Sequence, residues 1–226
     1  MEFNNCMGQA HWIKPAAYPQ IKDRIYYRII SRDSNMPLLE TTVHIDILDM
    51  AMAFFVLINS DETGFISMAV CERMADYWEV TAEEIREQAE RNTPILFPKK
   101  IRSLRDMVTE LCQANGDSTA VGAIQGYPQG KITPYVLTNA YGIYGFSAVF
   151  YKGVLEGFAD CVGSSLFVLP SSTHEALLIP ESDGCNPNEL RKMVYEVNRV
   201  YVERKDFLSD NIYYYDREKG RLQIEE

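Results

Sequence analysis

The residues best suited to acid–base chemistry are gathered in one short polar turn. Ser171, Ser172, His174 and Glu175 supply two hydroxyls, an imidazole and a carboxylate between two apolar runs. An imidazole that lies near a hydroxyl and a carboxylate can activate a nucleophile by general base catalysis. A catalytic turn of this kind would make the protein a small hydrolase-like enzyme centred on these four residues.

The same turn has a structural interpretation, which we favour. Neighbouring residues of a tight turn rarely point at one substrate atom, and the nucleophile, base and orienting group of an enzyme normally come from separate segments. The glycines of a nucleophile elbow are absent, and Leu178 stands where the second histidine of an H-E-x-x-H motif would be. We therefore predict a hairpin turn whose hydroxyls bind nearby backbone groups.

A second polar group precedes the apolar block Met50 to Ile58. On an extended chain His44 and Asp46 would share one face, which suits a metal ion or a hydrogen-bonded pair, and Asp49 follows closely. Two ligands do not make a metal site, and the sequence offers no third. We predict no metal and no cofactor, and keep His44 and Asp49 as candidate binding residues.

Tyrosines form the third candidate group. The chain has 14 tyrosines, among them the run Tyr213, Tyr214 and Tyr215. A tyrosine joins a large apolar ring to a polar tip, so it suits half-buried strands as well as contact surfaces. Strand packing explains most of the excess, and the run at 213–215 is the candidate face for a partner.

Charge and length exclude several classes of protein. The 226 residues carry a formal net charge of -10, whereas nucleic acids and anionic membranes bind clusters of Lys and Arg. The longest apolar stretch, Met50 to Ile58, is too short to cross a bilayer. We expect neither a nucleic acid nor a membrane as a partner.

The cysteines indicate a reducing compartment. The 5 cysteines are odd in number and widely scattered, and no C-x-x-C pair occurs among them. This pattern fits neither a disulfide framework nor a zinc ribbon. No basic-then-apolar signal segment opens the sequence, so we predict a cytoplasmic protein.

The local patterns predict an α+β fold. Strand-length apolar runs occur at 24–30, 50–58, 65–70, 134–139, 146–151, 166–169, 176–179, 212–215 and 222–224. Helix starts are indicated by a Thr81–Glu84 capping box, by Ser103, by Val154 and by Asn186 followed by Pro187. Short connections make neighbouring strands antiparallel. We predict mainly antiparallel sheets with amphipathic helices packed on one face, in two closely packed lobes.

Glycine density suggests where the lobes divide. We predict an N-terminal arm at 1–20, a first lobe at 21–118, a Gly-rich connection at 119–132 and a second lobe at 133–226 with the order ββαββαββ. The connection has neither a G-x-G-x-x-G motif nor the Gly-Lys-Ser/Thr of a P-loop, which argues against a nucleotide site.

Several motifs resemble those of a known family. They are Trp78 with Val80-Thr81-Ala82-Glu83-Glu84-Ile85, Asn92-Thr93-Pro94, the turn Pro170-Ser171-Ser172 with His174-Glu175, Val197-Asn198-Arg199, and Leu208-Ser209-Asp210 with Tyr213-Tyr214-Tyr215-Asp216. With them, residues 20–217 resemble an uncharacterised family, a domain of unknown function found in anaerobic Gram-positive bacteria. A second uncharacterised bacterial family is similar more distantly. The resemblance implies an intracellular bacterial protein, supplies no activity, and leads us to expect that this chain lacks a further N-terminal segment of the family.

The sequence therefore favours a non-catalytic binding or protein-interaction module, with a protein partner or a second copy of the chain bound to it. The hydrolase-like enzyme at Ser171, Ser172, His174 and Glu175 stays open as the alternative. A third hypothesis is an accessory protein whose acidic charge steers it to a basic partner, as in toxin neutralisation or phage defence.

Overall fold

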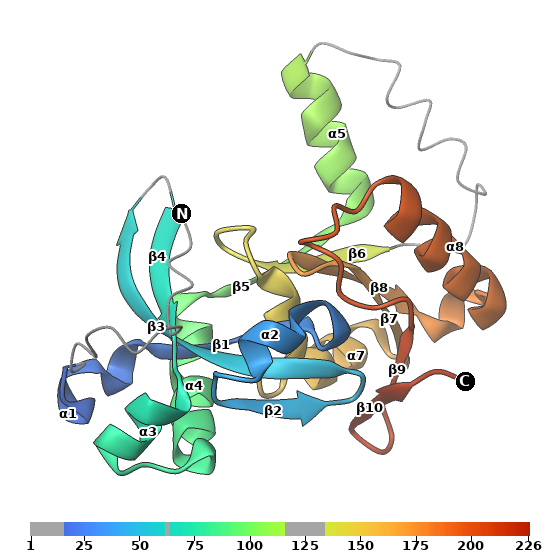
Figure 1. The fold of residues 1–226 in the computed structure, drawn as a ribbon. Coiled ribbons are helices and arrows are strands. Elements are labelled where there is room, and N and C mark those ends of the chain that lie inside the picture. Colours follow the sequence, from blue (N-terminus) through green and yellow to red (C-terminus); the bar gives the residue numbers. More distant parts are fainter. Residues whose placement is uncertain (1–15, 62–63, 116–133) are drawn as a thin grey trace. The chain divides into compact units, whose positions relative to one another are not determined.

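The fold is that of a computed structural model, which describes residues 16–61, 64–115 and 134–226 (Figure 1). The contacts within the chain divide it into two units, Met1–Pro98 and Lys99–Glu226. This division differs from the predicted one, because residues 99–115 belong with the second unit. The predicted connection at 119–132, and His11 and Trp12 of the predicted arm, lie outside the described residues.

Unit 1 is built on a four-stranded antiparallel sheet. Its central strand is paired with one strand along one edge and with two shorter strands along the other. The strand predicted at 50–58 is longer in the structure and continues through Asp61, so Asn59 and Ser60 also lie in the sheet. The strands are β1 (Ile25–Ser31), β2 (His44–Ile47), β3 (Met50–Asp61, central) and β4 (Gly64–Ala69).

The helices of unit 1 include one long helix that runs beside β1. This helix, α4, begins as predicted with the capping box of Thr81 and Glu84. Asn92 and Thr93 on α4 bind the backbone of β1, and so protect its edge. The helical elements are α1 (Tyr18–Ile21), η1 (Lys22–Arg24), η2 (Asp33–Asn35), α2 (Met36–Leu39), α3 (Glu72–Trp78) and α4 (Ala82–Leu96).

Unit 2 is built on a six-stranded antiparallel sheet in the order β10-β9-β7-β8-β6-β5. Figure 1 shows the hairpin of β7 and β8 in its interior. The antiparallel prediction is confirmed for every strand pair described. The strands are β5 (Lys99–Ser103), β6 (Tyr135–Asn139), β7 (Leu166–Ser172), β8 (Glu175–Pro180), β9 (Tyr213–Asp216) and β10 (Arg221–Ile224).

Helices cover both faces of this sheet, which adds a layer to the predicted arrangement. Leu190 and Val194 of one helix, α8, pack on Phe167 and Ile179. On the opposite face, Phe146 meets the ring of Tyr213 and Phe158 meets that of Tyr135. The helical elements of unit 2 are α5 (Leu104–Asn115), η3 (Gly145–Phe150), α7 (Val154–Val162), η4 (Glu181–Asp183) and α8 (Pro187–Val200).

The predicted strand at 146–151 is wrong. The segment forms the 3-10 helix η3, in which Gly145 to Val149 are all buried. A short apolar run that is buried all round carries no period by which a strand and a helix could be distinguished. The helix start predicted at Val154 is confirmed, because α7 begins at that residue.

Candidate functional site

The polar turn between β7 and β8 is a tight hairpin, as we predicted. Ser172 Oγ accepts a hydrogen bond of 3.0 Å from the backbone N–H of His174. Ser171 Oγ donates to Glu175 Oε1 at 3.3 Å, across the same turn. Both hydroxyls therefore make local contacts that hold the shape of the turn.

His174 uses both of its ring nitrogens. Nδ1 accepts a hydrogen bond of 3.1 Å from the backbone N–H of Tyr144, and Nε2 lies 3.1 Å from Asp206 Oδ1. A backbone N–H can only donate, so Nδ1 must be the unprotonated nitrogen. The imidazole is then the neutral tautomer whose Nε2–H is donated to the Asp206 carboxylate.

His174 in this way joins three segments of unit 2 that are distant in sequence. They are the loop before η3, the β7–β8 turn, and the segment between α8 and β9. The backbone N–H of Thr173 donates to the Asp206 carbonyl at 2.8 Å and strengthens the link to the third segment. The side chains of His174 and Asp206 are 33% and 25% exposed, so the pair lies at the edge of the solvent.

Gly145 allows the turn to approach the end of β6 closely. Thr138 Oγ1 donates to the His174 carbonyl at 2.8 Å, and the N–H of Phe146 donates to the Thr173 carbonyl at 3.2 Å. A Cβ at position 145 would lie 2.1 Å from Thr138 Oγ1 and 2.4 Å from the His174 carbonyl oxygen. Only glycine fits between the end of β6 and the β7–β8 turn.

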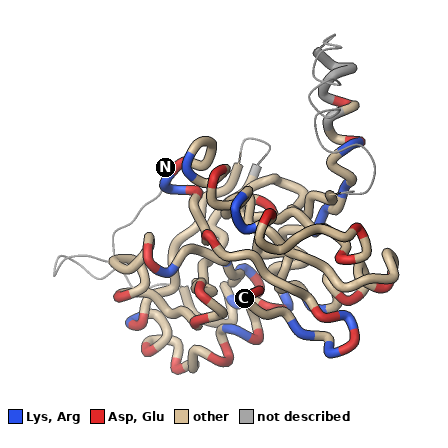
Figure 2. Tube along the Cα trace, turned by 90° about the vertical axis from the view of Figure 1, so that its right-hand side faces the viewer, with Lys and Arg blue, Asp and Glu red and all other residues tan. Residues whose placement is uncertain are grey.

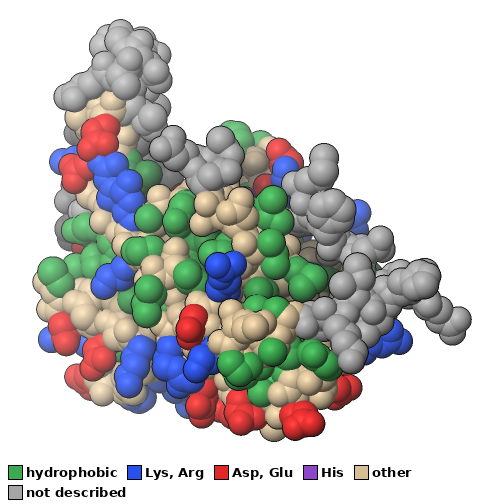
Figure 3. Space-filling view, turned by 90° about the vertical axis from the view of Figure 1, so that its left-hand side faces the viewer, with side chains coloured by type: hydrophobic (Ala, Val, Ile, Leu, Met, Phe, Trp, Pro, Cys, Tyr) green, Lys and Arg blue, Asp and Glu red, His purple; other side chains and the backbone are tan. Residues whose placement is uncertain are grey.

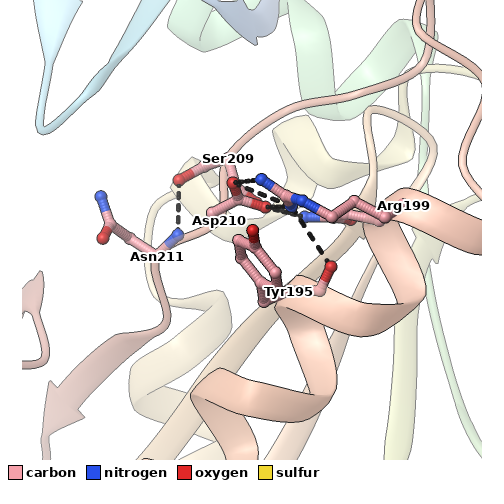
Figure 4. A network of polar contacts seen from close by, with 6 residues as sticks. Tyr195, Arg199, Ser209, Asp210 and Asn211 are labelled. Carbon is pink, nitrogen blue, oxygen red and sulfur yellow. Dashed lines mark hydrogen bonds and ion pairs between the residues drawn. The ribbon is translucent and has the colours of Figure 1, made fainter.

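A second polar cluster joins α8 to the segment before β9 (Figure 4). Asn198 is buried, and its Nδ2 donates to the Ser209 carbonyl and to Asp210 Oδ1, both at 2.9 Å. Arg199 donates to both oxygens of Asp210 at 3.1–3.2 Å, and its guanidinium carbon lies 3.3 Å from the centroid of the Tyr195 ring. This cluster fixes the guanidinium in one orientation.

The contacts of Asp210 change its acidity. Burial acts to raise the pKa of this carboxyl, but the hydrogen bonds from Arg199 and Asn198 and the charge of Arg199 outweigh that effect. The pKa of Asp210 in the folded protein is therefore below its usual value of 3.8. A lowered carboxyl pKa stabilises the fold at neutral pH, and that stabilisation is lost as the pH falls through the folded pKa.

Asp210→Asn should consequently destabilise the fold near neutral pH and have no effect below the folded pKa of Asp210. The expected loss is about 0.5 kcal/mol, because the ion pair is partly exposed and screened by solvent. Urea unfolding midpoints at the two pH values measure it. Arg199→Gln should remove the same pH-dependent part of the free energy of unfolding. If a variant is destabilised equally at both pH values, the ion pair of Arg199 and Asp210 is not the cause.

Comparison with models of protein families shows which family the chain belongs to. The model of a family described as Family of unknown function (DUF5688) matches residues 4–217. The chain belongs to this family. No curated protein and no solved structure matches it. Membership of DUF5688 brings no established activity, so the chemistry of the site has to be judged from its geometry.

The tyrosines at 213–215 lie in the sheet of unit 2 and not on an open surface. Tyr213 is 0% exposed and Tyr215 is also buried, so neither ring is accessible to a partner in this structure. Tyr214 packs on the opposite face beside Phe167, and its hydroxyl donates to Glu181 Oε2 at 2.8 Å. The alternation of strand side chains sends these rings into the layers on both faces of the sheet.

His44 and Asp49 are separated by a strand and a turn. His44 lies in β2, where Nδ1 is 2.9 Å from the Thr42 carbonyl, and Asp46 pairs with Arg32 at 3.3 Å. Asp49 follows Leu48, which has a left-handed backbone with φ of 55°. The spacing of His44 and Asp46 permits a hydrogen-bonded pair, but in the structure each of these two side chains binds a different group.

Across residues 16–61, 64–115 and 134–226, no group of three or more His, Cys, Asp or Glu residues is placed to hold a metal ion. In the part of the chain that the structure describes, no helix has the length and apolar character to span a bilayer.

The sequence did not single out Tyr144, Asp206, Arg199 or Asp210 as site residues. Tyr144 contributes a backbone N–H, which no side-chain pattern signals. Asp206 lies in an aperiodic segment between α8 and β9. Val197-Asn198-Arg199 and Leu208-Ser209-Asp210 were recognised as motifs, but their spacing along the chain gives no sign that they meet.

Proposed function

We propose that this DUF5688 protein is a non-catalytic module of the bacterial cytoplasm that acts by binding another protein. The observation that carries the proposal is the engagement of both nitrogens of His174, at 3.1 Å each, by a backbone N–H and by Asp206. The imidazole is the strongest general base in the polar turn, and no nitrogen of it is free to take a proton from a substrate or a nucleophile.

Comparison with a catalytic triad makes this argument specific. In a triad the carboxylate binds one imidazole nitrogen, and the other nitrogen accepts the proton of the nucleophile. Here Asp206 takes the place of the carboxylate, but the Tyr144 N–H occupies the nitrogen that would act as the base. Ser171 and Ser172 are meanwhile bound to Glu175 and to the turn backbone. The arrangement supports a structural role for His174.

Exposed residues on α8 and directly after it support binding. Tyr195 lies on α8 and Tyr201 is the residue that follows its last turn, and both side chains are exposed, Tyr201 at 80%. Arg199 is stacked on Tyr195 and held by Asp210, as Figure 4 shows. Tyrosine and arginine are enriched among the residues that dominate binding energy, and an arginine fixed in place loses less entropy when it binds.

The charge pattern favours a protein as the partner. Figure 2 shows Lys and Arg interspersed with Asp and Glu along the trace, and the chain has a net charge of -10. A nucleic acid would require basic residues gathered on one surface. Cys161 is an exposed free thiol, which supports the proposed reducing cytoplasm.

One observation favours the alternative, a hydrolase-like enzyme. The hydrogen bond between His174 and Asp206 is the kind that orients a catalytic base, and the pair is partly open to solvent. Loss of the Tyr144 N–H contact on substrate binding would release Nδ1. The enzyme then requires Ser171 or Ser172 to become nucleophilic.

A fluorophosphonate probe separates the two functions, because it labels serines that an adjacent base activates. We expect no labelling of Ser171 or Ser172 in the folded protein at neutral pH. Mass spectrometry of the probe-treated chain measures this, with a serine hydrolase as the positive control. Labelling that Ser172→Ala or Ser171→Ala abolishes, and that Ser182→Ala leaves unchanged, would overturn the non-catalytic proposal.

A further inference from the structure

Histidines are the side chains of this protein whose charge can change under mild conditions. Between about pH 8 and about pH 5 a histidine can take up a second proton, whereas Lys, Arg, Asp and Glu side chains of ordinary acidity keep their charges. Figure 3 shows such charges on one face of the molecule, where Lys and Arg lie beside Asp and Glu. The chain has 3 histidines, of which the structure describes His44 and His174. The contacts of these two decide what a second proton would change.

The contact of His44 survives protonation. Its Nδ1 is 2.9 Å from the Thr42 carbonyl, and because a carbonyl can only accept, this nitrogen carries the hydrogen. A second proton would add to Nε2, and the Nδ1–H would go on donating to the same carbonyl. Protonation of His44 therefore leaves its contact in place.

The contacts of His174 respond differently. Nδ1 accepts a hydrogen bond of 3.1 Å from the Tyr144 N–H. A protonated imidazole has two donors and no acceptor, so no orientation of the ring can keep this hydrogen bond. The contact of Nε2–H with the Asp206 carboxylate, at 3.1 Å, becomes an ion pair on protonation. The second proton thus breaks the contact with Tyr144 and holds the ring on Asp206.

The titratable groups around the imidazole, among the described residues, come from three segments. Asp206 lies in the segment between α8 and β9, and the Lys205 ammonium beside it is paired with Glu203 at 3.0 Å. Glu175 follows in the turn itself, and its carboxylate accepts a hydrogen bond from a serine of that turn. Tyr144 places a phenol ring 5.8 Å from the imidazole, centroid to centroid. The imidazole is 33% exposed, so a proton can reach it from water, and the charge in contact with it is that of a carboxylate.

Tyr144 has a backbone conformation that requires support. Its φ of 53° and ψ of 29° are left-handed, which is unfavourable for a residue with a Cβ. Asn139 holds the preceding residues, because its Nδ2 donates to the Ile143 carbonyl at 2.8 Å and its Oδ1 accepts from the Tyr141 N–H at 2.9 Å. His174 binds the N–H of Tyr144 itself. The loop at 140–144 is therefore held by Asn139 at residues 141 and 143, and by His174 at residue 144.

We propose that protonation of His174 in mild acid is a switch that releases the loop at 140–144, between β6 and η3, from the β7–β8 turn. Loss of the hydrogen bond lets Tyr144 leave the left-handed conformation, while Asp206 keeps the imidazole in place. Tyr141 in the same loop is 46% exposed, so the release moves an exposed aromatic ring. The inference goes beyond the proposed function, because it concerns the response of this loop to pH and not the partner that the module binds.

Hydrogen exchange followed by NMR tests the switch at the Tyr144 amide. Protection factors, which remove the intrinsic effect of pH on exchange, are compared at about pH 7.5 and about pH 5.5. We expect the protection factor of the Tyr144 N–H to fall about tenfold or more at the lower pH. His174→Gln should show no such fall, because an amide offers an acceptor and a donor that do not change with pH. His44→Gln is the matched control and should show the same fall as the unchanged chain.

Asp206→Asn gives a second measurement if His174→Gln fails to fold. It removes the charge that stabilises the imidazolium, so the fall in protection should require a lower pH, and a fall at an unchanged pH contradicts the switch. Equal protection of the Tyr144 amide at both pH values overturns it. So does a fall that His174→Gln shows as fully as the unchanged chain. None of these results affects the non-catalytic proposal, which fails only if the serines of the turn are labelled.

Discussion

Gly145→Ala is expected to destabilise unit 2 by about 3 kcal/mol or more, the upper end of the range for overpacked sites. The added methyl would lie 2.1 Å from Thr138 Oγ1, 2.4 Å from the His174 carbonyl oxygen and 2.8 Å from Asn139 N. Two of these atoms belong to the backbone and cannot turn aside as a flexible side chain would. The β7–β8 turn must therefore separate from the end of β6.

Gly157→Ala is the matched control for this prediction. Gly157 lies inside α7, and a Cβ there would meet nothing within 4 Å. Alanine is the better helix former by about 0.8–1 kcal/mol, so this variant should be more stable than the unchanged chain. Urea unfolding followed by circular dichroism measures both. Equal effects of the two substitutions would show that the close approach at Gly145 is not tight.

A loss of the His174 contacts should accompany the loss of stability in Gly145→Ala. The Thr138 hydroxyl and the Phe146 N–H both bind the β7–β8 turn, and the Tyr144 N–H binds the imidazole. Movement of residue 145 would disturb all three of these hydrogen bonds. Imidazole nitrogen shifts in NMR spectra would report this, because the tautomer of His174 depends on the Tyr144 N–H.

Local signals explain which parts of this fold were predictable. The capping box of Thr81 and Glu84 and the cap at Asn186 depend on residues within one helical turn, and both are present. The β3–β4 and β7–β8 hairpins follow from apolar runs joined by short turns. Each of these features depends on residues that lie close together in the sequence.

Features that depend on distant partners were not predictable. Thr138 binds the carbonyl of His174 across 36 positions, and Tyr144 binds its ring across 30. Gly145 resembles any other turn glycine in the sequence, because the atoms that exclude a Cβ come from β6 and from the β7–β8 turn. The hairpin role of the polar turn was predictable, whereas the partners of its histidine were not.

The run at 213–215 shows how the layers of a fold decide the role of a residue. With helices on one face only, alternate tyrosines would reach a solvent surface. In unit 2, Tyr213 meets Phe146 of η3, and Tyr214 packs with the α8 cluster on the other face. The alternation of side chains along a strand sends neighbouring rings to opposite faces, but it does not reveal that both faces lead into packed layers.

Tyr213→Ala should therefore cost about 3–5 kcal/mol, as expected for an aromatic side chain removed from a core. Tyr213 is 0% exposed, so its loss leaves a cavity between β9 and η3. Tyr201→Ala is the matched control, since a side chain that is 80% exposed should change stability by less than about 0.5 kcal/mol. Urea unfolding followed by circular dichroism compares the two variants. A small effect at Tyr213 would mean that this ring is not packed in a core and would restore the run at 213–215 as a candidate binding face.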